Sequence, residues 1–98
     1  MLETFTTTTF AGHLGETFRI HPDGRAPFDA ALVAVTPLGA GGVAGGRRAF
    51  SLVFRGPRDA PVPQRIYRVE HDRLGAFDLF LVPIGPDGEG MRYEAVFT

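Results

Sequence analysis

Three histidines are the side chains of this sequence best suited to holding a metal ion. They are His13, His21 and His71, and the densest group of ligand types is Glu70-His71-Asp72. Adjacent residues of a strand point to opposite faces, so Glu70 and His71 cannot share one ion unless the backbone bends. We therefore expect a solvated turn around His71, no metal site and no cofactor.

The sequence offers little for covalent catalysis, because Ser51 is the only serine and no nucleophile-elbow glycines flank it. We predict no catalytic residue. An arginine beside tyrosines can bind a carboxylate or a peptide, and such residues lie on both sides of the proline-rich stretch 57–64. The candidate binding residues are Arg55, Tyr67, His71, Arg92 and Tyr93, although ion pairs with Glu70 or Glu94 would explain the same arginines.

Composition limits the class of protein. The chain has 98 residues, which suits a single domain over 1–98, and it has no cysteine for a disulfide or a thiolate metal site. All ten cations are arginine and the net charge is −1, so we do not expect nucleic-acid binding. No apolar run of membrane-spanning length occurs, and residues 1–9 do not resemble a signal peptide. The expected location is the cytoplasm, with no membrane partner.

The charges are unevenly distributed along the chain. The stretch from Arg47 to Arg73 holds seven arginines against three acids, whereas residues 74–98 hold one arginine against four acids. A basic middle and an acidic end could attract each other within one fold or between two subunits.

Alternating apolar residues predict six strands, over residues 16–20, 28–38, 49–56, 65–71, 76–85 and 89–97. A short helix is expected over Phe10–Leu14, ending at Gly15, and would dock on the sheet as a lid. A change of phase at Leu32-Val33 predicts a bulge. The glycine-rich segment Gly39–Gly46 lacks the residues of a phosphate-binding loop, and we interpret it as a flexible hairpin connection.

The closing hairpin is the strongest local pattern. Pro86-Asp87-Gly88 suits a three-residue loop with Gly88 at positive φ, which would place Gly85 opposite Glu89. The inward pairs would then be Leu81–Tyr93, Leu79–Ala95 and Phe77–Phe97. The same reasoning applied to Pro22-Asp23-Gly24 pairs Phe18 with Phe28.

No helix is long enough for a crossover between parallel strands, so the sheet should be antiparallel. The predicted fold class is mainly β: a six-stranded antiparallel bent sheet, a small barrel or a sandwich, with one short N-terminal helix.

Several segments together carry a family resemblance, namely FSLVFRGP, PVPQRIYRVEH, LGAFDLFLVPIGPDGEGMRYEAVFT and the opening TFAGHLGETFRI. They cover nearly the whole chain except the glycine loop, and they resemble a family of small bacterial domains with no assigned function. The resemblance implies no catalytic residues. Some relatives are encoded near phage-tail-collar-like proteins, which implies a structural or accessory role.

The sequence therefore favours a non-enzymatic structural or protein-interaction module whose partner is another protein or a second copy of the chain. The outer face of the closing hairpin is too apolar to stay exposed, so we predict a homodimer interface there. Its residues are Phe80, Val82, Glu94 and Val96. The alternative is a small-ligand-binding β-barrel or a minor enzyme using Arg55, Tyr67 and His71; an enclosed apolar pocket would favour it.

Overall fold

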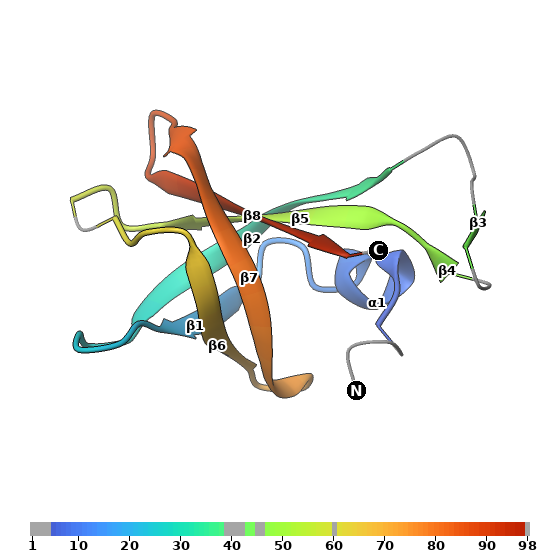
Figure 1. Cartoon of the computed structure of the whole chain (residues 1–98), viewed down its shortest axis with the longest axis horizontal. Helices are drawn as coiled ribbons and strands as arrows, with labels where there is room; N and C mark the ends of the chain where they lie inside the picture. Colours follow the sequence, from blue (N-terminus) through green and yellow to red (C-terminus); the bar gives the residue numbers. More distant parts are fainter. Residues whose placement is uncertain (1–4, 39–42, 45–46, 60, 98) are drawn as a thin grey trace.

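The computed structural model describes residues 5–38, 43–44, 47–59 and 61–97. Six strands close into a barrel in the order β1-β2-β5-β8-β7-β6, and β3 and β4 form a separate two-stranded sheet (Figure 1). The elements are α1 (Thr7–Ala11), β1 (Thr17–His21), β2 (Phe28–Pro37), β3 (Val43–Ala44), β4 (Arg47–Arg48), β5 (Phe50–Gly56), β6 (Arg65–His71), β7 (Gly75–Pro86) and β8 (Met91–Phe97).

All the strand pairs of the barrel are antiparallel, which confirms the predicted fold class and selects the barrel among the three architectures. Closure occurs where β1 pairs with β6, with Ile20 opposite Val69. β1 and β6 would be the edge strands of an open sheet. Because they pair with each other, the backbone hydrogen-bonding groups of their paired segments are satisfied. Within the described residues, no helix is long and apolar enough to span a membrane.

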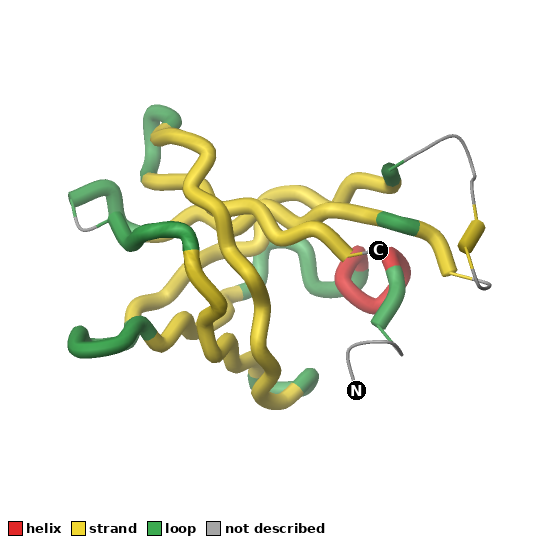
Figure 2. The backbone as a smooth tube through the Cα atoms, in the orientation of Figure 1, coloured by secondary structure: helices red, strands yellow, loops and turns green. Residues whose placement is uncertain are grey.

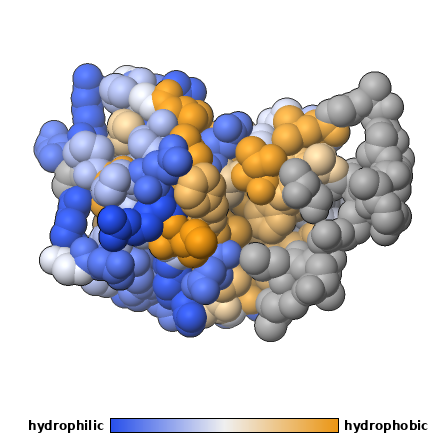
Figure 3. All heavy atoms as spheres, viewed as in Figure 1, coloured by the Kyte–Doolittle hydropathy of each residue, from blue (hydrophilic) through white to orange (hydrophobic). Residues whose placement is uncertain are grey.

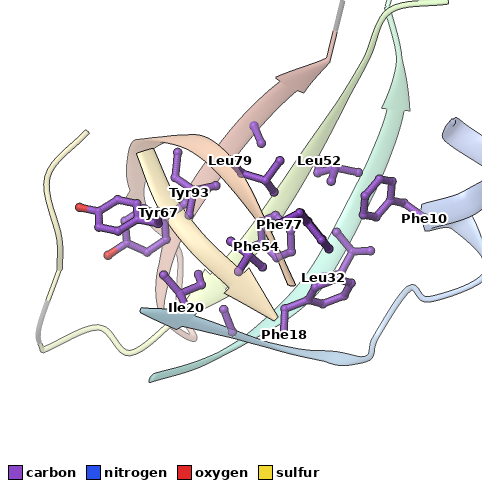
Figure 4. Close-up of a cluster of buried hydrophobic side chains, with 14 of the residues drawn as sticks. Phe10, Phe18, Ile20, Leu32, Leu52, Phe54, Tyr67, Phe77, Leu79 and Tyr93 are labelled. Carbon is purple, nitrogen blue, oxygen red and sulfur yellow. The ribbon is translucent and has the colours of Figure 1, made fainter. Parts of the chain in front are cut away.

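Side chains fill the barrel interior (Figure 4). Alternate residues of each strand point inward, as the sequence predicts, and Phe18, Leu52, Phe54, Val69 and Leu81 are all fully buried. These side chains come from four different strands, so burying them fixes the strands relative to one another.

The helix α1 covers one end of the barrel. Thr6 caps it, because the Thr9 backbone N–H donates to the Thr6 hydroxyl at 3.3 Å and the Thr6 N–H donates to the Thr9 hydroxyl at 3.1 Å. This reciprocal capping explains why the helix begins three residues before the predicted Phe10–Leu14 segment. Gly15 does not end the helix; it takes a φ of 85° in the turn before β1. The predicted lid role fits the burial of Phe10, which has no exposed surface.

Three loops gather at the opposite end of the barrel, joining β1 to β2, β5 to β6 and β7 to β8 (Figure 2). The proline-rich loop between β5 and β6 is attached there by two tyrosines from the barrel. The Tyr93 hydroxyl accepts the backbone N–H of Val62 at 2.9 Å, and the Tyr67 hydroxyl donates to the carbonyl of Pro63. Val62 is 3% exposed, so this loop packs into the barrel end instead of extending into solvent.

The predicted register of the closing hairpin is wrong by two residues. Val82 pairs with Glu94 and Pro83 with Tyr93; a bulge at Ile84 then brings Gly85 opposite Arg92, and Pro86 opposite Met91. Gly85 takes the positive φ of 102°, whereas Gly88 does not have a positive φ. The shift of two applies up to Pro83 and keeps the side chains before the bulge on their predicted faces, whereas beyond the bulge Gly85 differs from its predicted partner by three residues.

The first hairpin shows the same two-residue difference. Phe18 pairs with Ala30 and Ile20 with Phe28, so the loop is longer than Pro22-Asp23-Gly24, although Gly24 has the positive φ that the turn requires. The predicted bulge in β2 is confirmed, since the pairing with β5 shifts between Leu32 and Ala34. Residues 39–42 and 45–46 of the predicted glycine-rich connection lie outside the described residues.

Candidate functional site

Two histidines that the sequence separates by 58 positions meet beside the end of the barrel that α1 covers. His13 lies in the loop after α1, Glu16 directly before β1, and His71 at the end of β6. Their ligand atoms all lie within 4.8 Å of one another. The His71 side chain is 4% exposed, the His13 side chain 14% and the Glu16 side chain 44%. The expectation of a solvated turn at His71 is therefore wrong.

A single carboxylate oxygen joins the two imidazoles. Oε1 of Glu16 lies 2.8 Å from Nδ1 of His13 and 2.7 Å from Nε2 of His71. The hydrogen bond from His13, followed by that from His71, lowers the pKa of Glu16 below its ordinary value. The ionised carboxylate is therefore the form that the cluster stabilises.

The other ring nitrogen of His71 decides where its proton lies. Nδ1 accepts the backbone N–H groups of Arg73 at 3.1 Å and of Leu74 at 3.2 Å. An acceptor nitrogen carries no proton, so the neutral ring must carry its proton on Nε2 and donate it to Glu16. His71 thus caps the β6–β7 turn through one nitrogen and holds Glu16 through the other.

Two histidines and a carboxylate are the donor set of many transition-metal sites. A histidine that binds a metal through Nε2 usually donates its Nδ1–H to a carboxylate or a carbonyl. His71 has the opposite arrangement, because its Nδ1 faces two N–H donors. The cluster therefore fits a metal ion poorly while the β6–β7 turn keeps this conformation.

The candidate residue Arg55 is held by the β7–β8 loop. Its Nε donates to Asp87 at 2.8 Å, and its Nη1 lies 3.5 Å from the Glu89 carboxylate. The hydrogen bond from Arg55, with the backbone N–H of Glu89 second, lowers the pKa of Asp87 to about 2. The arginine thus pairs with this loop and not with Glu70 or Glu94.

The other candidate binding residues lie in different parts of the barrel. Tyr67 and Tyr93 point inward with their hydroxyls bound to the proline-rich loop, and His71 lies four residues from Tyr67 along β6, at the other end of the barrel. Arg92 lies opposite Arg55 across β5 and β8, and its Nε donates to the carbonyl of Gly85 at 3.3 Å. Ligand binding by the five residues stays a prediction.

The outer face of β6, β7 and β8 carries four apolar side chains, Ile66, Phe80, Val82 and Val96, which we call the apolar strip. Figure 3 shows hydrophobic side chains gathering over these strands in the middle of the view. Ile66 is 63% exposed, Phe80 49% and Val96 55%, and Val82 is half-buried. Ile66 and Phe80 are direct cross-strand partners. The predicted outward position of Phe80, Val82 and Val96 is confirmed.

Over residues 5–97 the chain matches the family described as "Domain of unknown function (DUF6916)". This chain belongs to the DUF6916 family. No curated protein and no solved structure matches it. The match confirms the resemblance of the sequence segments to a family without an assigned function. It covers the whole barrel and α1.

Two features of this DUF6916 domain were missed by the sequence reasoning. The outward position of Ile66 could have been predicted, because its neighbour Tyr67 points inward and adjacent strand residues point to opposite faces. The tight turn at residues 72–74 also sets the register that pairs Ile66 with Phe80. The meeting of His13 and Glu16 with His71 had no local signal. It depends on β1 pairing with β6, which is a tertiary property of the barrel.

Proposed function

We propose that this DUF6916 domain is a non-enzymatic protein-interaction module that binds its partner through the apolar strip. The observation that carries the proposal is the exposed Ile66–Phe80 pair on paired strands, together with Val96, which is 55% exposed and follows Glu94 by two residues on β8. Isolated exposed apolar residues are common on proteins, but a contiguous group rimmed by charges is typical of a protein-binding surface.

The charged rim supports the same function. Arg68 pairs with Asp78 at 3.1 Å next to the Ile66–Phe80 pair, and Glu94 borders Val82 on the other side. An apolar centre with charges around it provides affinity through burial and selects the partner through the rim.

The alternative of a ligand-binding barrel or a minor enzyme has less support. Phe54, Leu79 and Leu81 fill the space that a ligand inside the barrel would need. Arg55 is bound by Asp87, and the Tyr67 hydroxyl by Pro63. The Nε2 of His71 is bound by Glu16 and its Nδ1 by two backbone N–H groups. A substrate would have to displace these contacts.

Crosslinking of the tagged, full-length chain in its own cell tests the proposal. We expect the proteins captured by the wild-type chain to be lost with Phe80→Asp and kept with Leu14→Asp. The two positions are matched, because each side chain is 49% exposed and Leu14 lies outside the strip. A captured set that Phe80→Asp leaves unchanged, in a variant with wild-type circular dichroism, would contradict binding through this face.

A further inference from the structure

We propose that the partner of the apolar strip is a second copy of this chain, packed strip to strip about a two-fold axis at Phe80. This inference rests on the proposed function, since it names the occupant of the same surface. The positions of the charges around the strip support it.

The strip has an arginine and a glutamate placed symmetrically about its centre. Arg68 lies on β6, the strand on one side of β7. It is opposite Asp78, which precedes Phe80 by two residues. Glu94 lies one strand away in the other direction, on β8, level with Val82, two residues forward. Phe80 is thus the midpoint between a cation and a carboxylate on the outer face.

This layout makes the surface complementary to itself. A symmetric dimer uses one patch on both copies, so residue i of one copy meets residue j of the other, and j meets i. We place the two-fold axis in the plane of the interface, through Phe80 and perpendicular to the line from Arg68 to Glu94. Rotation about this axis brings Arg68 against Glu94 of the second copy. The same operation stacks Phe80 on its equivalent and places Ile66 near Val82 of the second copy.

The two charged groups are available for such contacts. Arg68 and Asp78 are both more than half exposed, and an exposed ion pair of this kind holds its arginine only weakly. The side chain of Glu94, on a strand whose backbone pairs with β5 and β7, forms no hydrogen bond or ion pair with the described part of the chain. A surface for an unrelated protein has no need of a cation and an anion placed equally about its apolar centre, whereas a dimer of identical chains does.

Light scattering coupled to size-exclusion chromatography tests the second-copy proposal on the full chain. At tens of micromolar we expect twice the chain mass of 10.6 kDa. Phe80→Asp should raise the dissociation constant about tenfold or more, as expected for a central interface residue. Leu14→Asp is the matched control and should leave the dimer unchanged.

Charge exchange tests the geometry without altering the apolar centre. Arg68→Glu and Glu94→Arg should each weaken the dimer, because each places like charges together, and the double variant should restore it. A monomeric wild-type chain, or a dimer that neither Phe80→Asp nor the charge variants affect, overturns the second-copy proposal. If the chain is monomeric but Phe80→Asp still abolishes crosslinked capture, the strip binds another protein and only the identity of the occupant is wrong.

Discussion

Nε2 of His71 and Oε1 of Glu16 lie 2.7 Å apart, joining the end of β6 to the residue before β1. Glu16 also binds β2 through its backbone, because its carbonyl accepts the backbone N–H of Leu32 at 3.0 Å. One residue therefore ties three strands together beside the end that α1 covers.

The first prediction concerns the His71 proton and metal binding. Because Nδ1 accepts two backbone N–H groups, nitrogen NMR at neutral pH should find the proton on Nε2. Adding zinc should not raise the melting temperature, and adding a chelator should not lower it. Stabilisation by zinc that disappears in Glu16→Gln would show that the turn rearranges and that the cluster is a metal site.

The second prediction concerns the pH dependence of stability through Glu16. Its pKa is lowered from the ordinary value of 4.5, so the folded protein binds this proton more weakly than the unfolded chain. The carboxylate therefore stabilises the fold above pH 4.5, and this contribution is lost as the pH falls below that value. We expect the wild type to melt higher than Glu16→Gln at neutral pH, with the difference shrinking below pH 4.5.

Asp59→Asn is the matched control for that measurement, because Asp59 is an exposed acid in the β5–β6 loop. Its melting temperature should follow the wild type at every pH. A constant difference between wild type and Glu16→Gln from neutral pH down to pH 3 would mean that the charge of Glu16 does not contribute.

The side-chain pattern predicts which residues of the strands point inward, because alternation depends only on the strand itself. Tyr67, Leu79 and Tyr93 are buried as expected, and the even shift of the closing hairpin leaves them on the same face. Six antiparallel strands in 98 residues, with only one short helix, also favoured a closed or strongly bent sheet.

The hairpin registers were less predictable, since they depend on contacts outside the turn. Asp87 suits a tight turn, but its side chain accepts the backbone N–H groups of Glu89 and Gly90 and is held by Arg55 of β5. These bonds favour a longer loop, and the bulge before it restores the pairing. The Arg55 contact reaches across 32 residues of sequence, so the turn residues alone could not indicate it.

The third prediction compares two glycines of the closing hairpin. Gly85 has a φ of 102°, a conformation that an L-residue rarely adopts, whereas Gly88 has no positive φ, and an added Cβ would find open space at both. Gly85→Ala should lower the free energy of unfolding by about 1–3 kcal/mol, the usual range for such backbone strain. Gly88→Ala is the control and should change it much less, as measured by urea denaturation. Equal effects of the two substitutions would argue against this hairpin conformation.

The fourth prediction concerns the bond that attaches the proline-rich loop. Tyr93→Phe removes the acceptor of the Val62 backbone N–H and leaves that buried donor unpaired. The loss should be about 1–3 kcal/mol of unfolding free energy, the cost of one buried unsatisfied group. Amide hydrogen exchange should also speed up at Val62. Unchanged stability together with unchanged exchange at Val62 would contradict a structural role for this hydroxyl.

The last prediction tests whether α1 is held by its packing on the barrel. The helix has five residues, too few to persist alone in water, so its position must depend on tertiary contacts. Phe10 supplies them: it is fully buried, and its ring centroid lies 5.5 Å from that of Phe97 and 6.0 Å from that of Phe50.

Phe10→Ala should therefore cost about 3–5 kcal/mol of unfolding free energy, the range for deleting a buried phenylalanine side chain. Leu14→Ala, at a half-exposed position after the same helix, should cost much less. Urea denaturation measures both values, and hydrogen exchange at residues 7–11 shows whether the helix detaches before the barrel unfolds. If Phe10→Ala and Leu14→Ala lose similar, small amounts of stability, α1 is not held by this ring, and the barrel end must be stable without it.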